Sequence, residues 1–144
     1  MSRYKVIQTE FRSLQSLQAA LVDVLRNPSA FQVAPSPKTP SLQLYDWHGQ
    51  SRPEHASIRI PRQAVNRFSS GSSNDVGFAW NGKTFEAIVS EYDQDPQYGC
   101  TNMLNRVRQR YALHELRSQA KAKGYTLREH VHPDGSINLV LTHR

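Results

Sequence analysis

Two short turn sequences most constrain how this chain can fold. Asn81–Gly82 and Asp134–Gly135 each stand between segments in which apolar and polar residues alternate, and this combination is typical of a β-hairpin. The two strands of a hairpin are antiparallel, because a turn of a few residues reverses the direction of the chain. The sequence therefore predicts an antiparallel sheet.

The first turn also predicts a register. A type I′ turn needs positive φ at both central residues, which Asn81–Gly82 tolerates. A two-residue loop here pairs Phe78 with Phe85 and Val76 with Ala87. We expect the shared apolar face to lie in the core, with Phe78 and Phe85 as buried cross-strand neighbours. That face consists of Val76, Phe78, Trp80, Phe85, Ala87 and Val89.

The second turn predicts a longer loop. A two-residue loop would mix polar and apolar residues on one side of the hairpin, whereas a three-residue loop pairs Val131 with Ile137 and Leu127 with Leu141. Because a slip of one residue moves every side chain to the other face, the apolar match favours the three-residue loop. Glu129 interrupts the apolar side that results.

Two segments show the spacing of apolar residues that predicts helices. The first follows Ser13, a favourable N-cap residue, and ends at Asn27–Pro28, because proline cannot continue a helix. The second is longer and extends from Pro96 to Gly124. Proline is favoured in the first turn of a helix and glycine just after the last, which suits these bounds.

Three further alternating segments, 4–11, 42–47 and 56–60, predict strands, and the Pro-rich stretch 35–40 and the Ser/Gly-rich stretch 69–74 predict loops. In chain order the predicted elements are β-α-β-β-β-β-α-β-β. We therefore predict an α+β fold in which an antiparallel sheet has two helices packed on one face.

The length and composition favour a single domain over residues 1–144. A chain of this size buries enough surface to fold without metal ions or disulfides, and its single cysteine, Cys100, excludes a disulfide within the chain. No apolar run approaches the ~20 residues that a membrane helix needs. The N-terminus has no apolar leader segment. We expect a protein of the cytoplasm that does not insert into membranes.

The positive charge is concentrated in one segment. The chain carries 18 Lys and Arg against 12 Asp and Glu, a net charge of +6. Residues 101–123 hold six of these cations and the single acid Glu115. In a helix, four of the cations fall on one sector of the surface: Arg106, Arg110, Arg117 and Lys121. We expect the side chains of this cation stripe to be more than half exposed.

Three interpretations of the cation stripe remain open. It can be the solvated face of a helix. It can also be a docking surface for an acidic protein, or a site that neutralises the phosphates of RNA or DNA. Charge patterning alone does not decide among them.

No group of residues predicts catalysis. His130 and His132 share one face of a strand, but a metal site needs three or four ligands and no third is placed beside them. The acids between residues 86 and 95 lead into a proline rather than converge on a cleft. Cys100 has no identified base. We expect no enzyme, no metal and no cofactor.

Three motifs resemble those of one family. They are DVGFAWNGK at Asp75–Lys83, RQRYA at Arg108–Ala112 and DGSI at Asp134–Ile137. In order and spacing they are similar to motifs of a small family first catalogued as hypothetical chloroplast reading frame thirty-five, found in cyanobacteria, algal plastids and some phages. The resemblance implies a shared fold and a photosynthetic setting. It implies no reaction, cofactor or catalytic residue.

The charge and the resemblance together predict a small basic accessory or regulatory protein without enzymatic activity. We expect it to bind another macromolecule, an acidic protein or complex, through the cation stripe or an uncovered sheet face. The resemblance adds the plastid stroma to the cytoplasm as a possible compartment. The alternative is an RNA- or DNA-binding module that uses the basic helix 101–123.

Overall fold

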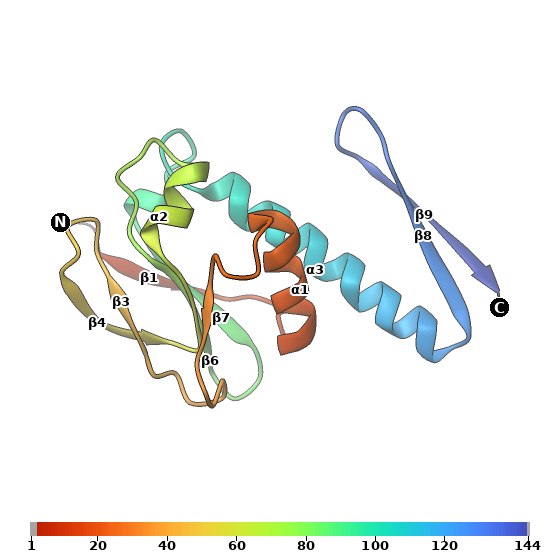
Figure 1. Cartoon of the computed structure of the whole chain (residues 1–144), viewed down its shortest axis with the longest axis horizontal. Helices are drawn as coiled ribbons and strands as arrows, with labels where there is room; N and C mark the ends of the chain where they lie inside the picture. Colours follow the sequence, from red (N-terminus) through yellow and green to blue (C-terminus); the bar gives the residue numbers. More distant parts are fainter. Residues whose placement is uncertain (1–2, 144) are drawn as a thin grey trace.

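An antiparallel sheet of five strands lies at the centre of the computed structural model, which describes residues 3–143 (Figure 1). In spatial order its strands are β1 (Tyr4–Ile7), β7 (Phe85–Ser90), β6 (Val76–Trp80), β5 (Ile58–Ile60) and β2 (Gln32–Val33). Two separate hairpins are β3 (Leu42–Tyr45) with β4 (Ser51–Ala56), and β8 (Tyr125–Val131) with β9 (Ile137–His143). The helices are α1 (Leu14–Leu25), α2 (Arg62–Val65) and α3 (Thr101–Ala122), with 3-10 turns at Asn66–Phe68 and Tyr92–Gln94. Within this described part, no helix has both the length and the apolar character needed to cross a bilayer.

The central sheet is covered on both faces. On one face Val76 and Phe78 of β6 belong to the main hydrophobic core, together with α1 and α3. On the other face Ile88 of β7 packs with Leu44 and Ala56 of the β3–β4 hairpin. Helices, sheet and hairpin therefore form three layers (Figure 1).

Helix α1 forms where the sequence predicts it because both of its ends are capped. The hydroxyl oxygen of Ser13 accepts a hydrogen bond from the N–H of Ser16. At the other end Arg26 adopts a φ of 59°, and its N–H donates to the carbonyl of Val22. The apolar side of the helix, including Leu17, is buried in the main core.

Tyr111 of α3 fixes the start of α1. Its hydroxyl oxygen accepts hydrogen bonds from the N–H groups of Arg12 and Ser13, at 2.8 and 3.0 Å. Its ring packs against Phe11, with 4.7 Å between the ring centroids. The tyrosine of the RQRYA motif thereby positions the two long helices against each other.

Asp75 connects β6 to the β3–β4 hairpin and to α2. Its carboxylate accepts hydrogen bonds of 2.8 Å from the N–H of Tyr45 and from the N–H of Arg62. Burial raises the pKa of Asp75 above its ordinary value, although these two hydrogen bonds oppose the rise. The aspartate of the DVG motif therefore serves the packing of the layers.

Helix α3 begins later than the sequence predicts. The expected first residue was Pro96, but the helix starts at Thr101. The carboxylate of Asp95 accepts hydrogen bonds from the N–H groups of Gln97 and Tyr98 instead. This local turn competes with the helix for the first N–H groups of the segment.

The β6–β7 register differs from the predicted one by two residues. Phe78 pairs with Ala87, and Trp80 pairs with Phe85, so the prediction that Phe78 and Phe85 face each other across the strands is wrong. A shift of two residues keeps each side chain on its face. Both phenylalanines are therefore buried in the core, as predicted.

The side chain of Asn81 explains the shift. Its Oδ1 atom accepts hydrogen bonds of 2.8 Å from the N–H groups of Lys83 and Thr84. These bonds stabilise a loop of four residues, 81–84, in place of the expected two. Gly82 adopts a φ of 101°, but Asn81 does not have a positive φ, so the predicted type I′ turn is wrong.

The β8–β9 register is confirmed. Val131 pairs with Ile137 and Leu127 with Leu141. Gly135 adopts a φ of 87°, as a left-handed residue in the three-residue loop. The side chain of Asp134 supports the same loop, because its Oδ1 atom accepts a hydrogen bond of 2.9 Å from the N–H of Ser136.

The predicted element order was incomplete. The expected strand 56–60 spans the last residue of β4 and all of β5, and neither β2 nor α2 was predicted. Residues 3–143 therefore contain three α-helices rather than two, and their strands form three sheets rather than one. A strand of two residues and a helix of one turn are too short to show periodicity.

Gly77 allows the β3–β4 hairpin to approach the central sheet. A Cβ atom at this position would lie 2.8 Å from the Cβ of Ala56 and 3.1 Å from a methyl group of Leu44. The first distance is shorter than a carbon–carbon contact permits, so a larger residue would push the layers apart. The glycine of the DVG motif thus has a packing role.

Gly77→Ala should therefore lower the free energy of unfolding by about 1–3 kcal/mol, the usual cost of overpacking an interior. The double variant A56G/G77A, which removes the methyl group that the new Cβ meets, should be less destabilised than the sum of the two single variants. Urea unfolding of the four proteins measures both effects. Strictly additive values would contradict the contact.

Candidate protein-binding surface

The β8–β9 hairpin lies apart from the central sheet, beside the C-terminal half of α3 (Figure 1). It follows α3 directly through Gly124, whose φ of 81° lets the chain reverse after the helix. The hairpin face that carries Leu127, Glu129 and Leu139 is turned toward α3. The contact between the hairpin and α3 therefore determines how much of this face is exposed to solvent.

Glu129 holds the hairpin to α3. Its carboxylate lies 3.2 Å from Nη1 of Arg110 and 3.0 Å from Nη2 of Arg117. These two arginines are seven residues apart, so they occupy the same side of the helix. The residue that interrupts the apolar side of the hairpin in the sequence is therefore the one that attaches it.

Arg110 also connects this contact to α1. Its Nε atom lies 2.8 Å from Oδ2 of Asp23, and Nε2 of His114 lies 2.6 Å from the same oxygen. Partial burial raises the pKa of Asp23, but the hydrogen bonds from His114 and Arg110 outweigh it and hold the pKa below its ordinary value. Helix α1, helix α3 and strand β8 are thus joined by one cluster of charged side chains.

Two of the four cations of the predicted stripe are paired with acids, and the other two are exposed. The side chains of Arg110 and Arg117 are 20% and 36% exposed and paired with acids, so the expectation that they would be more than half exposed is wrong. Sequence reasoning missed their partners, Asp23 and Glu129, because both are distant in the chain. Arg106 and Lys121 are exposed, as expected of the stripe.

Arg106 has a second contact. Its guanidinium lies 5.9 Å from the centroid of the Phe68 ring, a cation–π distance. No ion pair joins Arg106 or Lys121 to an acid among residues 3–143. These two cations therefore remain available to a partner.

Two hollows lie on either side of the Glu129 contact. The larger, about 530 Å³, lies between α3 and the hairpin, and its apolar wall consists of Leu116, Ala120, Tyr125, Leu127, Leu139 and Leu141. Lys123 also lines it. The smaller, about 460 Å³, lies between α1, α3 and the hairpin turn, and Arg26 and Arg106 are among its lining residues. Both hollows thus combine apolar side chains with cations.

The apolar side of the hairpin is only partly covered. On this side the exposed fractions are 54% for Val131, 41% for Leu139 and 59% for Leu141, while Val140, on the opposite face, is 54% exposed. On the helix side, Leu116 is 45% exposed. Single exposed apolar residues are common in proteins, but a group of neighbouring ones makes this region the candidate interaction surface of the described residues.

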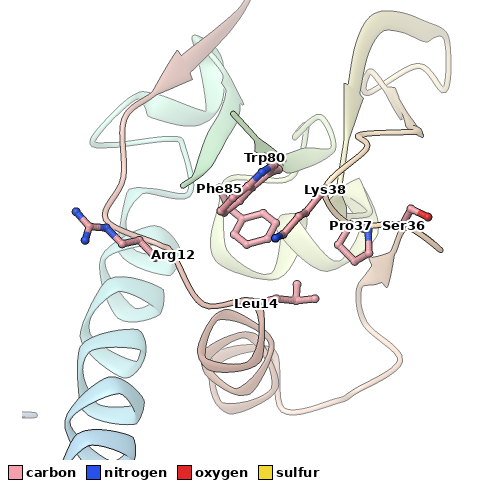
Figure 2. A pocket seen from close by; sticks show the side chains of 7 residues that line it. All are labelled: Arg12, Leu14, Ser36, Pro37, Lys38, Trp80 and Phe85. Atoms are coloured by element: carbon pink, nitrogen blue, oxygen red, sulfur yellow. The ribbon is translucent and has the colours of Figure 1, made fainter. Parts of the chain in front are cut away.

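A different hollow, of about 460 Å³, lies where the Pro-rich loop 35–40 meets α1 and the β6–β7 hairpin. Figure 2 shows Trp80 and Phe85 on one side of it, Leu14 below and Lys38 beside the aromatic rings. The Nζ atom of Lys38 lies 5.5 Å from the centroid of the Trp80 ring. Because Lys38 already contacts the indole, we assign this hollow a packing role for the loop.

The other residues considered from the sequence do not form a reactive site. Cys100 is buried, and burial together with the nearby charge of Asp93 raises the pKa of its thiol to about 12, so the reactive thiolate does not form near neutral pH. Asp93 itself is buried and accepts hydrogen bonds from Asn74 and Ser90. Between residues 3 and 143 no group of three or more His, Cys, Asp or Glu is arranged to hold a metal.

These features define the chain as a small α+β protein whose long helix carries a partly uncovered hairpin. It belongs to the family described as "Protein of unknown function (DUF1257)", whose model matches residues 31–140. The match covers all three motifs and ends within β9. Comparisons with curated proteins and with solved structures gave no match. Membership of an uncharacterised family is therefore established.

Glu129→Gln should loosen the hairpin from α3, because a neutral amide does not hold two guanidinium groups. Loss of hydrogen bonds to a charged group costs about 1.5–3 kcal/mol, so amide hydrogen exchange in β8 should become at least about tenfold faster while exchange in β6 and β7 stays unchanged.

The matched control is Glu91→Gln. Glu91 forms a surface ion pair of 3.5 Å with Lys5, both well exposed, and such pairs contribute little to stability. Exchange in β8 should not respond to it. Equal effects of the two substitutions would contradict an attaching role for Glu129.

The pKa of Asp23 predicts a dependence on pH. Because its folded-state pKa lies below the unfolded value, its contribution to stability is present above about pH 4 and is lost as the pH falls through the folded pKa. Asp23→Asn removes that contribution at every pH. The difference in free energy of unfolding between the wild type and D23N should therefore be larger at about pH 5 than at about pH 3. Urea titrations at the two pH values measure it, and an unchanged difference would refute the assigned shift.

Proposed function

We propose that this protein is a non-enzymatic accessory protein that binds an acidic partner protein through the surface between α3 and the β8–β9 hairpin. We call this the hairpin surface, and it comprises Leu116, Lys123, Leu127, Leu139 and Leu141. The observation that carries the proposal is the contiguous group of leucine side chains exposed beside α3.

The hairpin surface suits apolar side chains of a partner. The larger hollow has a volume of about 530 Å³, and four of its eight lining residues are leucines. No nucleophile with an adjacent base is among its lining residues. An apolar groove without converging polar groups favours association over chemistry on a small substrate.

The cations around the hollows favour an acidic partner. Lys123 lines the larger hollow, and Arg26 and Arg106 line the smaller one. Two of the nearby acids, Asp23 and Glu129, are already paired with cations within the chain. A segment with apolar residues flanked by Asp or Glu would complement both features.

A nucleic acid is the weaker candidate. Arg110 and Arg117, half of the cation stripe, cannot bind phosphates without releasing Glu129. The two remaining members, Arg106 and Lys121, are roughly 22 Å apart along the helix axis at 1.5 Å per residue. Within the cation stripe, two widely separated cations are few for a phosphate-binding site.

The setting also belongs to the proposal. The resemblance to the family first catalogued as hypothetical chloroplast reading frame thirty-five supports action in a cyanobacterium, an algal plastid or a phage that infects such a cell. The protein would then bind its partner in the cytoplasm or in the plastid stroma.

The test is affinity capture from nuclease-treated lysate of the source cell, with wild-type protein and Leu116→Asn as bait. L116N places a polar group on the hairpin surface and should reduce capture of the partner at least about tenfold, the effect of roughly 1.4 kcal/mol. Higher salt should weaken wild-type capture, since the partner is acidic.

Val6→Asn is the matched control, because Val6 is also an exposed apolar residue but lies on β1, outside the hairpin surface. It should leave capture unchanged. Capture that disappears on nuclease treatment, together with salt-sensitive binding to a generic RNA or duplex DNA, would replace the proposal with the nucleic-acid alternative. Equal capture by wild type and L116N would refute the assigned surface.

A further inference from the structure

Strand β9 leaves one edge of its hairpin unpaired. It is hydrogen-bonded to β8, and among residues 3–143 no other strand pairs with it. Six of its seven residues, from Asn138 to His143, are exposed. The backbone N–H and C=O groups along such an edge are a template for another strand.

The chemistry of this edge does not discourage pairing. From Ile137 to His143 the strand has no Lys, Arg, Asp, Glu or Pro. Its register with β8 runs without a bulge over seven residue pairs. Proteins usually protect edge strands with charge, proline, bulges or short length, and β9 has none of these. In contrast, β8 carries Arg128 and Glu129.

The hairpin is also too small to be a stable sheet by itself. Two-stranded sheets are marginal in water, and a third strand or a packed layer is needed. Helix α3 supplies part of such a layer through Glu129, yet Leu139 and Leu141 stay exposed. An additional strand beside β9 would complete the sheet.

We infer that the additional strand is β9 of a second copy of this chain. Antiparallel pairing about a two-fold axis at Val140 places Leu139 opposite Leu141 of the second copy, and Asn138 opposite Thr142. In the five central pairs apolar side chains meet apolar ones and polar side chains meet polar ones, and only the end pairs join Ile137 to His143, so the centre of the strand is complementary to itself. The result is a sheet of four strands, β8-β9-β9-β8, with one α3 on the same face of each half.

This dimer is independent of the proposed function, because it uses the edge of the hairpin rather than the groove beside α3. It places the exposed leucines of both copies side by side and enlarges the apolar face. The β9–β9 dimer and the complex with an acidic partner should respond oppositely to salt. Each copy carries a net charge of +6, so screening strengthens the dimer, whereas it weakens binding to an acidic partner.

Sedimentation equilibrium of the full chain over a range of concentrations tests the pairing. Wild type should form a dimer whose dissociation constant falls as salt is raised. Val140→Lys should increase that constant at least about tenfold, because the two introduced charges face each other. V140K and V140E should form a mixed dimer when combined, although neither self-associates. Val140 is exposed in one copy, so both variants should fold.

His130→Lys is the matched control, since His130 lies on the same face of the same hairpin but on β8. It should leave the dissociation constant near the wild-type value. The inference is overturned if wild type is monomeric at all concentrations, or if V140K and H130K weaken the dimer equally. It is also overturned if L116N, and not V140K, dissociates it, because that result assigns the contact to the groove.

Discussion

The contact of Glu129 with Arg110 and Arg117 determines what the rest of the molecule presents to its surroundings. It ties the C-terminal hairpin to α3 at one point, and Arg110 extends the tie to Asp23 on α1. Without these charges the hairpin would keep only its apolar contacts with α3. With them, the leucines on either side of the contact are held in place but not covered.

Features determined by neighbouring residues could be predicted from the sequence. The N-cap of α1 at Ser13 and the β8–β9 register depend on side chains close in the chain, so the pattern of residue types was sufficient for both. The β6–β7 register was predicted incorrectly because the side chain of Asn81 stabilises a longer loop. Short elements such as β2 and α2 depend on tertiary contacts and left no pattern.

The sequence predicted where the cations of the candidate site lie, but it did not predict which acids they pair with. The sequence placed four cations on one side of α3, yet it could not show that Arg110 and Arg117 meet acids 87 and 12 residues away. Motif residues proved to be structural: Gly77 admits the β3–β4 hairpin, and Tyr111 binds the start of α1. Both roles depend on the close approach of segments that are distant in the chain, which a sequence pattern does not show.

The order of pairing in the central sheet has a consequence for synthesis on the ribosome. Strand β1 pairs with β7, and Tyr4 lies opposite Ser90. The central sheet therefore cannot form until Ser90 has been synthesised, and the core is complete only after α3 has been made. Among the described elements the β8–β9 hairpin is made after all the others, and it consists of local contacts, which form fast. Its uncharged strand therefore leaves the ribosome when the nascent chain has few other unpaired strands with which it could misassemble.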